Sequence, residues 1–163
     1  MLDSETGRKR YFVVHGGLFS RDDVTLDDVA GVDRFACKQP GQEGLMMELL
    51  WSDPQTAPGR GPSKRGVGLG FGPDISRAWC QKNGVTAVLR SHEVRQNGYA
   101  EEHDGLCCTV FSAPNYCDSA GNLGAFGRID AHGTLNWTTF QAQPHPNIRP
   151  MAYAGGPMGG LLA

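Results

Sequence analysis

Short apolar runs that stop at histidines are the first feature of the hydrophobic pattern. Residues 11–14 form such a run, which ends at His15-Gly16-Gly17. Residues 86–90 form a second one, and after Ser91 it leads to His92. Apolar, partly β-branched runs of this length are typical of buried strands. Both histidines are therefore expected at strand ends.

Apolar residues at helical spacing predict three helices. Residues 25–32 and 43–50 have this spacing, and the second segment leads into Trp51-Ser52-Asp53-Pro54. The third helix is the best defined, because Pro73 suits a first helical position and Gly84 is placed to end the helix. We expect these helices to pack on the strands.

The second half of the chain predicts mostly antiparallel strands. Short runs at residues 99–100, 107–112, 124–129 and 135–140 alternate with turn signals at Asp104-Gly105 and His132-Gly133. Combined with the helices, these strands place the chain in the α/β class.

Three segments are expected to lie outside regular structure. Residues 55–72 are dominated by Pro, Gly, Ser, Lys and Arg, which predicts one long exposed loop. Residues 154–163 are glycine-rich and predict a flexible tail. Residues 1–10 are interpreted as an artificial or non-native start, so the organised region is expected to be 11–153.

Composition indicates a soluble globular domain or a piece of one. The 163 residues include 39% hydrophobic and 20% charged positions. The net charge of -2, without a basic block, gives no reason to expect a nucleic acid or an anionic membrane surface as partner. No apolar run approaches the roughly 20 residues that cross a bilayer. We therefore expect neither nucleic acid nor membrane among its partners.

The five cysteines favour a reducing compartment. They are odd in number and show neither a C-x-x-C motif nor the spacing of a secreted disulfide framework. Reduced thiols are expected, and with them a cytoplasmic or nuclear location.

Candidate chemistry lies at His15, His92, Arg65, Asp53 and Tyr116. Each of the two histidines taken alone is either a metal ligand or a hydrogen-bonded strand-end residue. Arg65 either grips a phosphate with parallel hydrogen bonds or belongs to a solvated basic loop. Asp53 is either a buried orienting carboxylate or a turn residue. Tyr116 lies in a turn, where it either meets a substrate or only packs.

The glycines of residues 66–72 do not indicate nucleotide binding. No apolar strand leads into them, the G-x-x-x-x-G-K pattern is absent, and Pro73 separates them from the next helix.

Five short motifs, taken in their order along the chain, resemble those of a known protein family. They are His15-Gly-Gly-Leu, Trp51-Ser-Asp-Pro, Arg65-Gly-Val, Ser91-His-Glu and Ser112-Ala-Pro-Asn-Tyr-Cys. In this order they resemble the second half of the phosphoprotein phosphatases, the metal-dependent serine/threonine protein phosphatases. Residues 144–147 and 150–153 are similar to the type 5 branch.

The resemblance implies a fold and a set of roles. The fold is the carboxyl-terminal half of a calcineurin-like metallophosphoesterase, a central β-sandwich flanked by helices. In that family two metal ions, manganese, iron or zinc, hold a hydroxide that attacks the phosphorus of phosphoserine or phosphothreonine. By resemblance, His15 and His92 are ligands of one metal, Arg65 holds the phosphate, Tyr116 lines the site, and Asp53 is a carboxylate beside it.

The chain lacks the motifs that would complete this site. The family's G-D-x-H-G, G-D-x-V-D-R-G and G-N-H-E segments do not occur in the sequence. Two imidazoles cannot hold a dinuclear centre, so the chain alone is expected to be inactive and to need an amino-terminal half of the catalytic domain. The repeat domain through which the type 5 branch binds a chaperone would lie further upstream in a full-length protein.

Three functions fit these observations. The first is part of a phosphatase acting on phosphorylated proteins. The second is a non-catalytic module that competes for phosphatase partners, and the third is a metallophosphoesterase acting on small phosphoesters. Because half a sandwich leaves apolar faces and strand edges without partners, the isolated chain is expected to be marginally stable.

Overall fold

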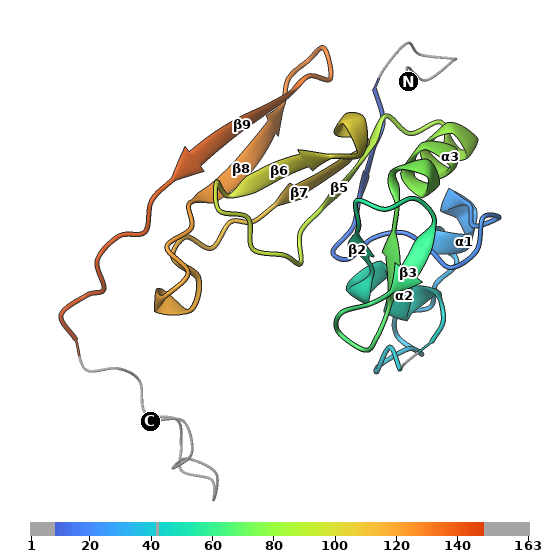
Figure 1. The fold of residues 1–163 in the computed structure, drawn as a ribbon, viewed down its shortest axis with the longest axis horizontal. Coiled ribbons are helices and arrows are strands. Elements are labelled where there is room, and N and C mark those ends of the chain that lie inside the picture. The colour runs from blue at the N-terminus through green and yellow to red at the C-terminus, as the bar shows by residue number, and fades with distance from the viewer. Residues whose placement is uncertain (1–8, 42, 149–163) are drawn as a thin grey trace, which may run out of the picture.

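A four-stranded sheet forms the centre of the molecule in the computed structural model, which describes residues 9–41 and 43–148 (Figure 1). The sheet has the order β1-β5-β7-β6, formed by β1 (Tyr11–Val13), β5 (Ala87–Arg90), β7 (Cys107–Val110) and β6 (Tyr99–Glu102). The expected strands before both histidines are thus confirmed. The tail at 154–163 and the first eight residues of the expected artificial start lie outside the described residues.

The three expected helices are present within one or two residues of their predicted bounds. They are α1 (Leu26–Ala30), α2 (Leu45–Trp51) and α3 (Pro73–Asn83). Thr25 caps α1 through its side chain, which accepts a hydrogen bond from the Asp28 backbone. Pro73 begins α3, and Gly84 ends it in the left-handed conformation, as the sequence predicts.

The prediction of one exposed loop over residues 55–72 is wrong. This segment joins a second sheet of order β2-β4-β3, made of β2 (Asp53–Pro54), β3 (Arg60–Pro62) and β4 (Leu69–Phe71). The apolar alternation in β4 is limited to Leu69 and Phe71, and the Phe71 side chain is fully buried. Gly70 lies between them, where a Cβ would come within 2.2 Å of the end of the Gln55 side chain. The prediction was wrong because it took the glycines of this segment as signs of a loop, whereas some of them lie in strands.

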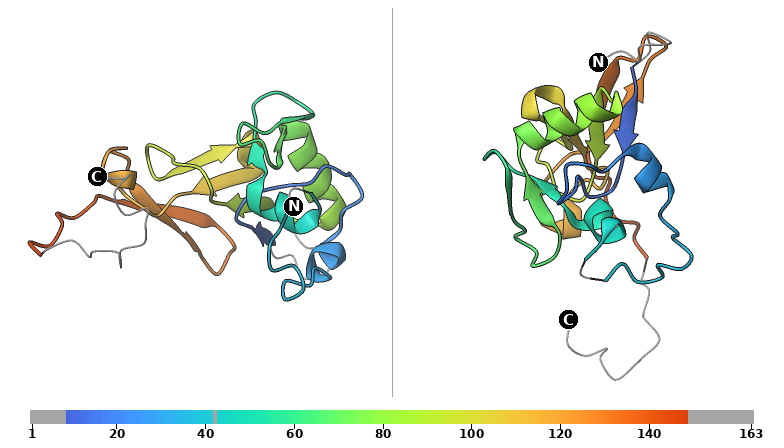
Figure 2. Two further views of the ribbon diagram at one scale, coloured as in Figure 1. Left: turned by 90° about the horizontal axis from the view of Figure 1, so that it is seen from below. Right: turned by 90° about the vertical axis from the view of Figure 1, so that its right-hand side faces the viewer.

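A hairpin of β8 (Gly124–Ile129) and β9 (Leu135–Phe140) covers part of the central sheet. The views in Figure 2 place this hairpin on the side of the central sheet away from the helices. Tyr11 links the two layers, because its hydroxyl donates to the Gly133 carbonyl oxygen at 2.8 Å. The α/β sandwich expected from the sequence is confirmed.

The expectation of mostly antiparallel strands in the second half is correct only in part. The pairs β6–β7 and β8–β9 are antiparallel, but β7 pairs with β5 in parallel, with Val88 opposite Cys107. Short runs do not reveal strand direction, because side chains alternate in the same way in both arrangements. The parallel pairs bring the ends of distant strands to one edge of the sheet.

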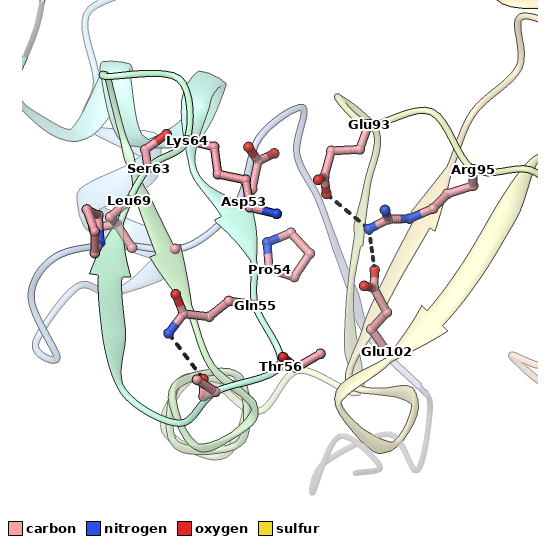
Figure 3. A pocket seen from close by; sticks show the side chains of 13 residues that line it. Asp53, Pro54, Gln55, Thr56, Ser63, Lys64, Leu69, Glu93, Arg95 and Glu102 are labelled. Carbon is pink, nitrogen blue, oxygen red and sulfur yellow. Dashed lines mark hydrogen bonds and ion pairs between the residues drawn. The ribbon is translucent and has the colours of Figure 1, made fainter. Parts of the chain in front are cut away.

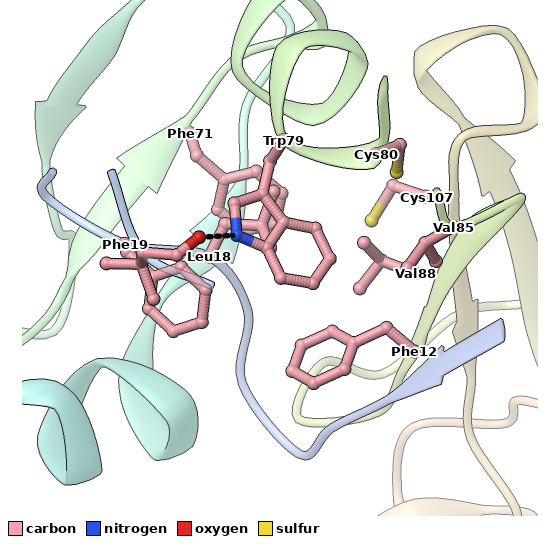
Figure 4. Close-up of a cluster of buried hydrophobic side chains, with 10 residues drawn as sticks. Phe12, Leu18, Phe19, Phe71, Trp79, Cys80, Val85, Val88 and Cys107 are labelled. Carbon is pink, nitrogen blue, oxygen red and sulfur yellow. Dashed lines mark hydrogen bonds between the residues drawn. The ribbon is translucent and has the colours of Figure 1, made fainter. Parts of the chain in front are cut away.

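Aromatic rings hold the helical layer against the central sheet (Figure 4). The centroid of Trp79 on α3 lies 4.8 Å from that of Phe12 and 5.7 Å from that of Phe19. The Trp79 indole N–H donates to the Val24 carbonyl oxygen at 2.9 Å. This cluster fixes β1 and α3, and through them the loops that follow β1.

The outer edge of the central sheet is left open at β1. This strand pairs only with β5 among the described residues. Its Val13 side chain is 74% exposed, which is unusual for a valine in a strand. An apolar pocket beside it is lined by Val14, Val29 and Leu49 among others. An exposed strand edge flanked by apolar surface is a site where further polypeptide packs.

Burial separates the five cysteines into two groups. Burial raises the pKa of the Cys80 thiol to about 11 and the pKa of the Cys107 and Cys108 thiols to about 12. Cys37 and Cys117 are exposed, and all five are free thiols.

We expect a thiol reagent at pH 8 and low temperature to label Cys37 and Cys117 only, because the thiolate is the reactive form. Peptide mapping by mass spectrometry measures this, and labelling in denaturant provides the control in which all five cysteines react. Labelling of Cys107 in the native chain as fast as that of Cys117 would contradict a closed core.

Candidate functional site

The two histidines meet at the edge of the central sheet where β1 and β5 end. These strands are parallel neighbours, with Val13 opposite Leu89, so the residues that follow them lie side by side. The ring centroids of His15 and His92 are 5.0 Å apart. The Ser91 N–H donates to the His15 carbonyl oxygen at 3.1 Å and links the two loops. The expected placement of both histidines at strand ends is confirmed.

Two glycines allow the loop after His15 to pass close to α2 and β4. A Cβ on Gly16 would lie 2.5 Å from the backbone carbonyl carbon of Leu50, and one on Gly17 would lie 2.2 Å from the Phe71 ring. The Gly16 N–H donates to the Leu49 carbonyl oxygen at 2.8 Å. The glycines therefore place His15 beside the beginning of β2.

Asp53 is an orienting carboxylate rather than a turn residue. It begins β2, and its side chain is 17% exposed. Oδ2 accepts from Arg65 Nε at 2.7 Å, and Oδ1 accepts from Arg90 Nη2 at 2.6 Å. Burial alone would raise the pKa of Asp53, but the hydrogen bonds and positive charges of the two arginines outweigh burial and lower this pKa. The carboxylate is therefore ionised at neutral pH and fixed between two guanidinium groups.

Two nitrogens of the Arg65 guanidinium form hydrogen bonds within the protein, and the third is left open to a ligand. Besides the Nε bond to Asp53, its Nη2 donates to the His92 carbonyl oxygen at 3.1 Å. Within the part of the chain that the structure describes, Nη1 donates to no acceptor. The Arg65 side chain is 32% exposed. A guanidinium fixed in this way and open on one side fits an oxyanion such as a phosphate.

His92 has a backbone conformation that is uncommon for its residue type. Its φ of 75° lies in the left-handed region, which costs of order 1–3 kcal/mol for a residue with a side chain. Its Nδ1 lies 3.1 Å from Asp53 Oδ1. This buried nitrogen nevertheless has no partner with hydrogen-bond geometry among the described residues. The uncommon backbone conformation and the unpartnered ring nitrogen together make His92 a candidate ligand-binding residue.

The surroundings favour neutral imidazoles. Burial lowers the pKa of both His15 and His92, and the Arg90 and Arg65 guanidiniums lower both pKa values further, while Asp53 opposes the shift. A neutral imidazole is the form that donates a lone pair to a metal ion.

The histidine pair fits part of a metal centre. Two neutral, adjacent imidazoles with an unpaired buried ring nitrogen are suitable donors for zinc, iron or manganese. Within residues 9–41 and 43–148, no group of three or more His, Cys, Asp or Glu side chains is arranged to hold a metal. That the two histidines supply part of a ligand set therefore stays a prediction.

Tyr116 lies on the loop after β7, which is a different loop from those of the two histidines. It begins the short 3-10 turn η2 (Tyr116–Asp118), and its ring packs edge-on against Phe111 with centroids 5.1 Å apart. The side chain is 47% exposed. In the described part of the chain no hydrogen bond or ring contact joins Tyr116 to Asp53, Arg65 or the histidines. Its role in lining the site stays a prediction.

A polar pocket of about 350 Å³ borders the site at Asp53 (Figure 3). On its opposite wall, Arg95 binds Glu93 at 3.0 Å and Glu102 at 2.8 Å. These charges offset one another. Lys64, which precedes Arg65, also lines the pocket and has no hydrogen bond or ion pair among the described residues. The pocket therefore gives open, polar space beside Asp53, and its lining includes neither Arg65 nor the two histidines.

Arg90 and Glu93 belong to the site, but the sequence reasoning assigned them no role. Arg90 was counted within the apolar run at residues 86–90, and Glu93 only as part of a motif. The sequence did contain a signal for Arg90, because an arginine at the end of an apolar strand is expected to be buried together with carboxylates or carbonyl oxygens that balance its charge.

Comparison with known proteins identifies the family. Residues 2–96 match the model of the calcineurin-like phosphoesterases, which is more than half of the chain. The chain belongs to the calcineurin-like phosphoesterase family. The resemblance to the phosphoprotein phosphatases read from the five motifs is thereby confirmed. Metal dependence in general also follows from membership of this phosphoesterase family.

Relatives within this phosphoesterase family are serine/threonine protein phosphatases. Serine/threonine-protein phosphatase T of Schizosaccharomyces pombe is 66% identical over 151 residues, which cover 93% of this chain and 32% of that protein. Human serine/threonine-protein phosphatase 5 is 48% identical over 89% of this chain and 29% of its own length. The chain thus spans about a third of the length of these curated relatives.

A solved structure supports the same assignment. A protein serine/threonine phosphatase of Saccharomyces cerevisiae superposes with a TM-score of 0.79 and 47% identity, over 88% of this chain and 48% of that one. The expected fold, about half of a calcineurin-like phosphoesterase, is confirmed. None of the helices in the described residues has the length and apolar character of a membrane span.

Proposed function

We propose that this chain is the carboxyl-terminal part of the catalytic domain of a protein serine/threonine phosphatase that hydrolyses phosphoserine and phosphothreonine. The observation that carries the proposal is the joint attachment of Arg65 to Asp53 and to the His92 carbonyl oxygen. This attachment holds the guanidinium, which we propose to bind the substrate phosphate, beside a pair of neutral imidazoles. The names of the relatives supply the class of substrate.

In the proposed reaction the chain binds and orients the phosphoryl group. Arg65 donates from its open side to phosphate oxygens, while Asp53 keeps the guanidinium in one orientation. His15 and His92 hold one of two metal ions, which we propose to be manganese, iron or zinc. When bound, such ions lower the pKa of a water molecule and neutralise phosphate charge. Tyr116 is proposed to line the phosphate site.

The remaining ligands are proposed to come from an amino-terminal half of the catalytic domain. The free edge of β1, the exposed Val13 and the adjacent apolar pocket support this assignment, because they offer a strand edge and an apolar face. In the full-length protein we place a chaperone-binding repeat domain further upstream, and we propose phosphorylated proteins of the cytoplasm or nucleus as substrates.

Complementation tests the proposal. We expect this chain, co-expressed with the amino-terminal part of the catalytic domain of the Schizosaccharomyces pombe relative, to form a complex that releases phosphate from a phosphothreonine peptide when manganese is present. Neither part alone should do so. The same complex carrying His92→Ala is the control, and it should lose the activity because a metal ligand is missing.

Two other results would overturn the proposal. A stable complex that contains metal but hydrolyses no phosphopeptide would favour the non-catalytic binding module. A complex that hydrolyses only small phosphoesters, with no activity on phosphothreonine or phosphoserine peptides, would favour the small-molecule phosphoesterase.

A further inference from the structure

Arg90 is the largest fully buried side chain with a charge. It ends β5, and 1% of the residue is exposed. A buried guanidinium is costly unless its charge is balanced and its N–H groups are hydrogen-bonded. Arg90 meets both conditions. Its hydrogen-bond partners therefore show which parts of the chain the buried guanidinium connects.

The partners of Arg90 come from the three segments that carry the site. Its Nε donates to the Gly16 carbonyl oxygen at 2.7 Å. Its Nη1 donates to Glu93 Oε2 at 2.8 Å, and its Nη2 donates to Asp53 Oδ1 at 2.6 Å. Gly16 directly follows His15, and Glu93 directly follows His92. One rigid, planar group therefore joins both histidine loops to the carboxylate that holds Arg65.

Glu93 is itself fixed from the far side. Its Oε2 also accepts from Arg95 Nη2 at 3.0 Å, and Arg95 continues to Glu102 at 2.8 Å. Glu102 in turn accepts from the Thr109 hydroxyl on β7 at 3.1 Å. The clamp made by Arg90 is thus anchored in the central sheet and does not depend on loop atoms alone.

We propose that Arg90 is a positioning residue, whose buried guanidinium fixes the spacing of His15 and His92 and the orientation of Asp53. The inference rests on the proposed function, because it concerns the metal and phosphate groups of that same site. Lysine cannot replace it, since an ammonium group lacks the planar fork that reaches a carbonyl and two carboxylates in fixed directions.

Arg60 provides a matched control. It shares two of the bonds of Arg90 in kind, since its Nε donates to the Phe19 carbonyl oxygen at 2.6 Å and its Nη2 donates to Asp22 Oδ1 at 2.6 Å. Its side chain is 25% exposed, and neither partner is next to a site residue. A purely structural arginine clamp is therefore present in the same chain.

The test compares Arg90→Lys with Arg60→Lys in two measurements. In the first, the full chain is titrated with Zn²⁺ in competition with a chromogenic chelator, and the part of the binding that is lost in His15→Ala defines the imidazole site. In the second, kcat and KM for a phosphothreonine peptide are measured in the two-part complex. Thermal unfolding is recorded for every variant.

We expect Arg90→Lys to weaken Zn²⁺ binding at the imidazole site by roughly 10- to 100-fold and to lower kcat more than it raises KM. Arg60→Lys should lower the unfolding temperature without changing the Zn²⁺ affinity. Unchanged Zn²⁺ affinity in Arg90→Lys, or an equal loss in Arg60→Lys, would overturn the proposal.

A second variant covers the case in which Arg90→Lys does not fold. Glu93→Gln keeps the shape of the side chain and the buried guanidinium but removes one charge of the clamp. It should weaken Zn²⁺ binding as well, but by a smaller factor, and unchanged affinity would again overturn the proposal.

The two measurements also separate this inference from the proposed function. If the wild-type chain binds Zn²⁺ through His15 but the complex hydrolyses no phosphopeptide, the proposed function fails, whereas the Zn²⁺ titrations still test the role of Arg90.

Discussion

Replacing Arg65 by lysine in the two-part complex is expected to lower kcat/KM for a phosphothreonine peptide by roughly 100- to 1,000-fold. Arg65 uses Nε for Asp53 and Nη2 for the His92 carbonyl oxygen, and it still presents Nη1. Lysine has a single ammonium group, so it cannot keep both anchors and also make parallel hydrogen bonds to a phosphate. Steady-state kinetics with one peptide measures the loss.

The control for this change is Arg77→Lys. Arg77 lies on α3, its side chain is 53% exposed, and it forms a surface ion pair with Asp104 at 2.8 Å. Such a pair contributes little, so its replacement should leave kcat/KM unchanged. Equal kinetics for Arg65→Lys and the unmodified complex would show that Arg65 belongs to a solvated basic loop.

Replacing Trp79 by alanine is expected to destabilise the chain by about 3–5 kcal/mol. The indole fills the space between Phe12 and Phe19, and its N–H is the hydrogen-bond partner of the Val24 carbonyl oxygen. The loss includes the cavity and the indole hydrogen bond, while the Val24 carbonyl oxygen keeps its hydrogen bond from Asn83 Nδ2 at 3.3 Å. Because the isolated chain is expected to be marginally stable, near or below the lower end of the about 5–15 kcal/mol of whole domains, the variant should be largely unfolded. Urea unfolding followed by circular dichroism measures the effect.

Phe35→Ala is the comparison for Trp79→Ala. Phe35 is 87% exposed, so its truncation should change the free energy of unfolding by no more than about 0.5 kcal/mol. Equal stability of Trp79→Ala and the unmodified chain would mean that the aromatic cluster does not hold α3 on the central sheet.

Hydrophobic runs and end signals were enough to predict the strands before both histidines and all three helices. Pro73 and Gly84 marked the ends of α3 because each restricts or permits one backbone conformation. The prediction for residues 55–72 was wrong because there some of the glycines lie inside strands and do not mark a turn or an end of an element. Its glycines permit the close packing of β4 against Gln55, and their number concealed the alternation of Leu69 and Phe71.

The site was predictable as a set of residue types but not as a geometry. The motifs gave His15, His92, Arg65 and Asp53, which the structure brings together. Local sequence left open whether Asp53 was an orienting carboxylate or a turn residue. Its partners Arg65 and Arg90 are 12 and 37 positions away, so only the folded chain could decide.

The parallel pairing of β1 with β5 has a consequence for synthesis of the chain on the ribosome. Tyr11 lies opposite Ala87 in this pairing, so β1 is made long before its partner exists. Until β5 has left the ribosome, His15 has no His92 beside it and Phe12 has no closed core. Distant parallel pairing also forms slowly. The nascent chain therefore carries β1 without its β5 partner while the 76 positions from Tyr11 to Ala87 are made, and the histidine pair is assembled only after that.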